Sequence, residues 1–251
     1  FTKIMNNKIN SNKINIGDIM KKIFLTFLLF CSTFALSQER PFQAFFGINT
    51  DNPLAVVEAM DEYAASNCPQ TTGIRLMNEF FNGYDDTTHT IIVTYPNKMA
   101  YMAWANNFAS CPAAAKFLQK MNSISESTFQ TLGMPLLTGG DPSEDQVFQI
   151  FIMNVSDPAA YANAYSKLMN TEGQCPSSWG LVAMGPGVEP SESGTHFAYC
   201  GYKSLDSYLD GYMNQGNLTR EYETFLRKAP SFRDLLRVNM SAVVKDWTPG
   251  Q

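Results

Sequence analysis

The sequence predicts an α+β protein made of two consecutive copies of one β-α-β-β-α-β unit, the ferredoxin-like arrangement. The segment CPQTTGIRLM at 68–77 returns as CPSSWGLVAM at 175–184, a shift of 107 positions. The same shift superposes the only two histidines, His89 and His196. The order of strand-like and helix-like segments is also the same in both copies. A repeat of this length is a whole domain copied once rather than a short solenoid unit.

Each copy opens with an apolar strand that is followed by a helix. The strands are expected at 42–48 and 147–153, where apolar and polar residues do not alternate, so both faces of each strand should be buried. Asn-Pro at 52–53 and Asp-Pro at 157–158 then supply an N-cap side chain and a proline at the first helical position.

The rest of each copy supplies three more strands and two helices. A second strand is expected at about 73–78 and 180–184, and a third at 89–95 and 196–202, with a turn-rich hairpin between them. Two helices follow, the first capped by Asn97 or Ser204 and the second around 117–118 or 225–226. The fourth strand should lie within 128–137 and 237–247.

The two copies are expected to form one barrel. Residues 38–138 make the first copy, 139–145 the linker and 146–251 the second copy. Helices cover one face of each four-stranded sheet, and the apolar first strands indicate that the other face is buried as well. Packing the two sheets against each other buries both faces, so we expect a single-chain α+β barrel.

This element order, repeated over about 40–137 and 145–248, resembles the dimeric α+β barrel superfamily. That superfamily includes antibiotic-biosynthesis-type monooxygenases, stress-responsive barrel proteins and haem-handling members. The resemblance rests on element order and on the repeat, since the sequence has no signature motif of the superfamily. It implies that a tandem duplication provides both halves here, and that the protein is a monomer where single-copy relatives pair.

Residues 1–37 are expected to lie outside the fold, as an upstream stretch followed by a signal peptide. Met20 precedes two lysines and the apolar run 23–34, and small residues precede Gln38. This is the pattern of a secretory signal that is cleaved before Gln38. The apolar run is too short to span a membrane comfortably. We therefore expect a secreted or periplasmic protein.

Charge and cysteine content narrow the possible partners. Residues 38–251 carry 13 basic and 22 acidic side chains, a net charge of −9. This charge argues against nucleic acid and anionic membranes as main partners.

A Cys68–Cys111 disulfide within the first copy is possible in an oxidising compartment, and free buried thiols are the alternative. No C-x-x-C pair occurs, so we expect no metal site.

The two histidines are the candidate catalytic residues. Side chains alternate along a strand, so His89 shares a face with Tyr95, and His196 with Tyr202. That face is expected to meet the helices, and the resemblance implies a ligand cavity there. An imidazole at its mouth could act as a general base, a hydrogen-bond donor to a carbonyl, or a haem or metal ligand. The alternative is that each Thr-His pair closes a hairpin and its ring bonds a backbone carbonyl.

Aromatic side chains are the candidate ligand-binding residues. Phenol groups could orient a small apolar or aromatic molecule in such a cavity, although the same side chains could simply be core. The candidates are Tyr95, Tyr101, Trp104, Trp179, Tyr202 and Tyr208.

Three functions follow from these patterns. The first is a small-molecule-binding barrel, which the resemblance extends to a monooxygenase that needs no cofactor, with His89 or His196 as the catalytic group. The second is a non-catalytic binding or interaction module. Haem binding is the third.

Overall fold

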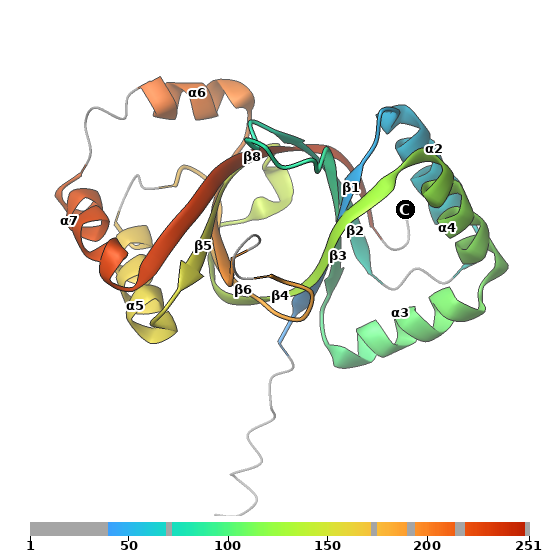
Figure 1. The fold of residues 1–251 in the computed structure, drawn as a ribbon, viewed down its shortest axis with the longest axis horizontal. Coiled ribbons are helices and arrows are strands. Elements are labelled where there is room, and N and C mark those ends of the chain that lie inside the picture. Colours follow the sequence, from blue (N-terminus) through green and yellow to red (C-terminus); the bar gives the residue numbers. More distant parts are fainter. Residues whose placement is uncertain (1–39, 69–71, 172–174, 190–193, 214–218, 249–251) are drawn as a thin grey trace, which may run out of the picture. The chain divides into compact units, whose positions relative to one another are not determined.

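Eight antiparallel strands close into a barrel, and the helices lie on its outside (Figure 1). The structure is a computed structural model, and it describes residues 40–68, 72–171, 175–189, 194–213 and 219–248. The predicted signal peptide and its cleavage site before Gln38 lie outside the described residues. Among the described residues, no helix is both long and apolar enough to cross a bilayer.

The first half contains four strands and three helices. Its elements are β1 (Phe42–Asn49), α2 (Pro53–Ala64), β2 (Gly73–Phe80), β3 (His89–Tyr95), α3 (Lys98–Ser110), α4 (Pro112–Ile124) and β4 (Glu126–Gly139). A 3-10 turn, η1 (Pro142–Glu144), leads to the second half. The predicted linker 139–145 therefore contains the last residue of β4 and this turn.

The second half repeats the same order. Its elements are β5 (Val147–Val155), α5 (Pro158–Met169), β6 (Trp179–Met184), β7 (His196–Tyr202), α6 (Leu205–Met213), α7 (Arg220–Lys228), the 3-10 turn η2 (Ala229–Ser231) and β8 (Arg233–Trp247). The fourth strand of each half is longer than expected. Both β4 and β8 pair with one strand of their own half and one strand of the other half.

The strand order is β1-β3-β2-β8-β5-β7-β6-β4, and β4 returns to β1. Each half contributes a four-stranded sheet with its fourth strand beside its first. The sheets join at two seams, one between β2 and β8 and the other between β4 and β6. The α+β barrel built from two βαββαβ halves is thus confirmed, and the two sheets meet edge to edge as one closed wall.

The predicted helix starts are also confirmed. Asn52, Asp157 and Asn97 each accept a hydrogen bond from the backbone N–H three residues later, at 3.1, 3.0 and 2.8 Å. Ser204 accepts one from the N–H of Ser207 at 3.1 Å. These bonds satisfy N–H groups that a helix start leaves without a partner.

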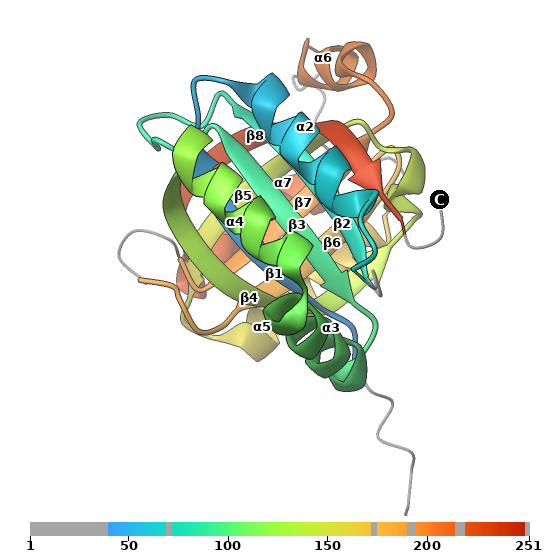
Figure 2. The ribbon, with the colours of Figure 1, turned by 90° about the vertical axis from the view of Figure 1, so that its right-hand side faces the viewer.

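The helices pack on the outer face of the barrel wall, as Figure 2 shows for α2 and α4. Val56, Met60 and Tyr63 of α2 are buried against Leu76 of β2 and Ile91 of β3 in the first core cluster. A second cluster packs α5 and α7 against β5, β6 and β7 of their own half. The outer face of each strand therefore meets helices while its inner face meets the barrel interior. This explains why the first strands are apolar on both faces.

Two disulfides tie loops to this framework. Cys68 after α2 is bonded to Cys111 at the α3–α4 junction, with Cα atoms 5.9 Å apart. Cys175 is bonded to Cys200 of β7, with Cα atoms 5.5 Å apart. The first bond is the possibility that the sequence offered, and the second was not foreseen. Disulfides of this kind are typical of proteins that work in oxidising compartments.

Candidate ligand-binding cavity

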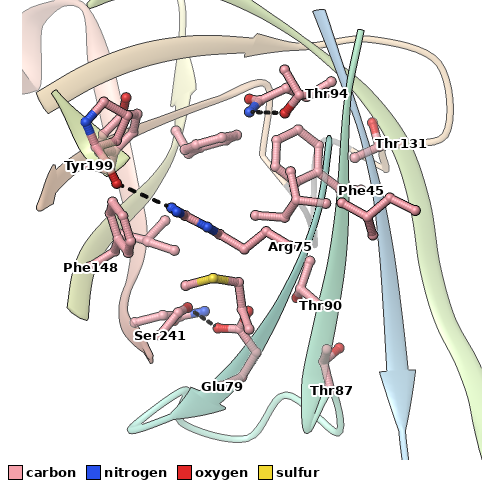
Figure 3. A pocket seen from close by; sticks show the side chains of 18 of the residues that line it. Phe45, Arg75, Glu79, Thr87, Thr90, Thr94, Thr131, Phe148, Tyr199 and Ser241 are labelled. Atoms are coloured by element: carbon pink, nitrogen blue, oxygen red, sulfur yellow. Dashed lines mark hydrogen bonds between the residues drawn. The ribbon is translucent and has the colours of Figure 1, made fainter. Parts of the chain in front are cut away.

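The barrel encloses a cavity of about 690 Å³. Every one of the eight strands contributes to its lining, because alternate side chains of a closed barrel point inward. Figure 3 shows inward side chains from several strands, among them Phe45, Thr90, Thr131, Phe148 and Tyr199.

Apolar side chains form the middle of the cavity. Phe45 and Phe197 meet edge to face with ring centroids 5.4 Å apart, and Phe148 meets Tyr199 in the same way at 5.9 Å. Such arrangements are favourable for aromatic pairs. The other large apolar lining residues are Ile74, Met77, Ile92, Phe129, Ile150, Ile152, Met184 and Trp247.

A carboxyl group lies at one end of the cavity. Glu79 of β2 accepts hydrogen bonds from the hydroxyls of Ser241, its partner across the β2–β8 seam, and Thr90 (Figure 3). Burial raises the pKa of the Glu79 carboxyl, and the two hydroxyls offset this only in part. Within the described residues, no lysine, arginine or histidine forms a salt bridge with Glu79.

The same end carries an ion pair and two unsatisfied polar atoms. Arg237 Nη2 lies 2.7 Å from Asp85 Oδ2, which belongs to the β2–β3 hairpin. Arg237 Nε and Asn239 Oδ1 are buried and have no hydrogen-bond partner. Both residues line the cavity beside Ser241, at alternate positions of β8. Buried polar atoms normally have partners, so a ligand could satisfy these two.

The other end opens to solvent. Arg75 of β2 forms a bidentate ion pair with Asp246 of β8, with distances of 2.7 and 2.9 Å. The Arg75 guanidinium also lies 5.7 Å from the ring centroid of Phe148. Asp141 and Ser143 line this rim and are exposed. We call it the open end because Asp141 and Ser143 are exposed there, and we call the end at Glu79 and Asn239, where Asn239 is buried, the closed end.

Neither predicted catalytic histidine lines this cavity. His89 is 3% exposed and His196 is 7% exposed. Each Nδ1 is hydrogen-bonded to the hydroxyl of the preceding threonine, at 3.0 Å for Thr88 and 2.9 Å for Thr195. Burial lowers the pKa of both imidazoles. The Thr-His pairs thus lie at the hairpins as one alternative expected, but the ring partners are the threonine hydroxyls and, for His89 Nε2, the side-chain amide of Asn78 at 3.4 Å, and not backbone carbonyls.

None of the six predicted aromatic residues lines the cavity either. Tyr95, Tyr101 and Trp104 contact one another on the helix side of β3, with ring centroids 5.1 to 6.1 Å apart. Tyr202 packs on Tyr208 at 5.2 Å. Trp179 meets the ring of Tyr165, with centroids 5.8 Å apart.

We expected the cavity to lie between the sheet and the helices, and the structure corrects this expectation. The alternation of side chains along each strand explains the difference. The histidines and tyrosines do lie on the helix face, as expected, but aromatic and aliphatic side chains pack there. The residues between them on β3, which are Thr90, Ile92 and Thr94, line the cavity. The ligand-sized space is therefore on the opposite face of the same strands.

The sequence contained a signal for the charged lining residues. In the segment GIRLMNE at 73–79, Arg75 and Glu79 share one strand face with Met77. In RVNMS at 237–241, polar residues alternate with apolar ones in the same way. Charged residues at alternate positions inside an otherwise apolar strand indicate that one face of the strand meets a polar space.

A histidine-ligated haem does not fit this cavity. Haem iron is held in proteins by histidine, cysteine, methionine or tyrosine. Both histidines face away from the cavity, and all four cysteines of the described residues are in disulfides. Nor do the described residues contain a group of three or more His, Cys, Asp or Glu side chains placed to hold a metal ion.

Comparisons with known proteins identify the fold. No protein-family model matches the chain, and no curated protein sequence does. A candidate monooxygenase from Fusobacterium nucleatum has a similar structure, with a TM-score of 0.58 and 15% identity over 84% of this chain and 96% of that one. An anthrone oxidase-like protein matches with a TM-score of 0.57 and 13% identity, over 85% and 95% of the two chains.

A candidate monooxygenase from Lactobacillus acidophilus matches with a TM-score of 0.53 and 15% identity, over 84% of this chain and 98% of that chain. Each match extends over both halves of the barrel, so these neighbours also carry two halves in one polypeptide. At such low identity the likeness concerns the fold alone. The chain has the fold of the dimeric α+β barrel proteins, with both halves of the barrel in a single polypeptide.

Proposed function

We propose that this protein binds a small, largely apolar and aromatic molecule inside its barrel. The observation that carries this proposal is the cavity of about 690 Å³, which is lined from all eight strands. Ligand sites usually have volumes of about 300–1,000 Å³, mainly apolar walls and a few polar groups that fix orientation. Here the aromatic rings form the wall, and the polar groups lie at the two ends.

The cavity can be tested by filling it. Replacing Ile150, which lines the cavity, with tryptophan should abolish the binding of Nile red, a neutral dye whose fluorescence rises in apolar sites. The matched control is Val244→Trp, because Val244 is exposed on β8 and does not line the cavity. Unchanged dye binding in Ile150→Trp would show that the cavity is not the binding site. Native mass spectrometry of protein from its own host would show which molecule it carries.

A second candidate function is a monooxygenase that needs no cofactor. Glu79 favours it, because a carboxyl group whose pKa is raised by burial can take a proton from a bound substrate near neutral pH. Removal of that proton would leave an electron-rich substrate able to react with O₂. The structural neighbours described as candidate monooxygenases are consistent with this chemistry.

Oxygen uptake tests the second function. An anthrone is a reasonable trial substrate, because one structural neighbour is described as anthrone oxidase-like. Glu79→Gln should abolish uptake, whereas His89→Gln should leave it largely intact because His89 faces away from the cavity. The opposite result would return the catalytic role to the histidine that the sequence suggested.

We also propose that the protein is a monomer. Both seams of the barrel, β2–β8 and β4–β6, form within one chain. No second chain is needed to close the barrel. Light scattering after size-exclusion chromatography should give the mass of one chain, and a dimer mass would contradict this.

A further inference from the structure

The charges that line the cavity do not balance. The lining contains the carboxylates of Glu79, Asp85, Asp141 and Asp246, and the guanidinium groups of Arg75 and Arg237. Arg75 is paired with Asp246, and Arg237 with Asp85. In the described part of the chain, Glu79 at the closed end and Asp141 at the open end have no ion-pair partner.

Asn239 provides an independent sign of a ligand at the closed end. It is 7% exposed, it lines the cavity, and its Oδ1 has no hydrogen-bond partner. It lies two residues from Ser241, the partner of Glu79 across the seam, which is about 7 Å along the strand. Two acceptors, one of them a carboxylate, therefore face the same region, and neither has a hydrogen bond or ion pair to a cationic side chain of the described residues.

The unpaired N–H group of Arg237, which lies on the same strand as Asn239, does not change the charge balance of the cavity lining. Arg237 Nε has no partner, but Asp85 already lies 2.7 Å from the guanidinium and offsets its charge. An uncharged oxygen on a ligand would satisfy that N–H group. An anionic ligand would instead meet Glu79 and Asp85 at the same end, and like charges at close range are unfavourable.

The aromatic wall suits a cation as well. The faces of aromatic rings attract ammonium groups, most strongly where water is excluded. Six aromatic residues line the cavity, namely Phe45, Phe129, Phe148, Phe197, Tyr199 and Trp247.

We infer that the ligand is an organic ammonium, an aromatic or apolar body bearing an amine, with its nitrogen at the closed end between Glu79 and Asn239. The inference rests on the proposed binding function and specifies the chemical class of the ligand. The ammonium donates to the Glu79 carboxylate and to Asn239 Oδ1, while the body packs among the rings. A cationic nitrogen there would oppose the effect of burial, which raises the pKa of Glu79 and which the hydroxyls of Ser241 and Thr90 and the charge of Arg237 offset only in part.

The test compares three ligands with one ring system. Isothermal titration calorimetry of the full chain at pH 7 would use 2-naphthylmethylamine, 2-naphthylmethanol and 2-naphthoate. The amine should bind at least about tenfold more tightly than the alcohol, since a hydrogen bond to a charged partner is worth roughly twice a neutral one. The naphthoate should bind most weakly.

Glu79→Gln keeps the side-chain size and removes the charge. It should reduce the amine's affinity about tenfold and leave the alcohol's affinity within about twofold. Glu62→Gln is the matched control, because Glu62 forms an exposed ion pair with Lys120 on the outside of the barrel. It should change neither affinity. If Glu79→Gln does not fold, Asn239→Leu offers a second variant, which should weaken amine binding severalfold and spare the alcohol.

The outcomes separate this inference from the proposed function. Equal affinity of amine and alcohol would overturn the inference while the binding function stands. Tightest binding of the naphthoate would also overturn it, and would point to Arg75 or Arg237 as the anchor. Failure of all three ligands to bind would count against both the inference and the proposed binding function.

A final readout needs no variant. Because an ammonium lowers the pKa of Glu79, amine binding should release protons at mildly acidic pH, which titrations in buffers of different ionisation enthalpy detect.

Discussion

Breaking the Cys68–Cys111 disulfide should lower the free energy of unfolding by about 4 kcal/mol. The bond closes a loop with a sequence separation of 43 residues, and the Cys175–Cys200 bond closes one of 25. In the chain-entropy model the first loop corresponds to about 4 kcal/mol of stability and the second to about 3.5 kcal/mol. A single domain is typically stable by only about 5–15 kcal/mol, so either loss should be large.

Urea unfolding of Cys68→Ala/Cys111→Ala, followed by tryptophan fluorescence, measures the first loss. Cys68 is buried, so the variant also loses some packing. The comparison variant is Cys175→Ala/Cys200→Ala, which keeps the first disulfide and should lose a similar amount of unfolding free energy. The two expected losses differ by less than the error of extrapolating the free energy of unfolding to zero urea, so which variant loses more is not a test.

The size of the loss is the test. A change below about 1 kcal/mol in the first variant would refute the argument from loop closure. It would mean either that the unfolded chain keeps this loop compact or that the thiols are reduced in the native protein. Mass spectrometry of the wild-type protein after thiol alkylation distinguishes these two explanations.

Three further outcomes are expected. Tyr165→Phe removes a buried hydroxyl that donates to two backbone carbonyls, at 3.1 and 3.3 Å, and should cost about 1 kcal/mol in urea unfolding, whereas Tyr212→Phe at an exposed position should cost nothing measurable. NMR titrations of His89 and His196 should have midpoints below pH 6.5, because burial lowers the pKa of both imidazoles in the folded state. Their contribution to stability should therefore fall as the pH drops through 6.5. A midpoint at or above 6.5 would contradict this. Gly187 has φ of 96° and approaches a backbone carbonyl, so Gly187→Ala should destabilise by about 1–3 kcal/mol, and an unchanged melting temperature would argue against strain there.

The fold could be predicted because its signals are local and occur twice. Proline after a capping side chain at 52–53 and 157–158 fixed two helix starts, and the repeat showed that the same unit occurs twice. The seams were harder to foresee, since pairing of β2 with β8 joins residues at least 160 positions apart. No local pattern encodes such a pairing.

The cavity was missed for a different reason. Strand alternation assigns residues to two faces, but it does not say which face leaves a space. His89 and Tyr95 were correctly placed on the helix face, where packed side chains fill the volume. Arg75 and Glu79, on the inward face, have no repeat counterpart of similar chemistry, so the repeat does not point to them. The charged residues that do not repeat were the better guide to the site.

The duplication has a consequence for how a ligand can enter. In a barrel made of two identical chains, every inward side chain appears twice, and a ligand meets the same surroundings in either orientation. Here Arg75 corresponds to Val182 and Glu79 to Pro186 in the second copy. The ion pair of Arg75 and the carboxyl group of Glu79 both lie at the β2–β8 seam. A molecule with two different ends therefore has one preferred direction, and a chiral molecule presents one of its sides to the charged seam.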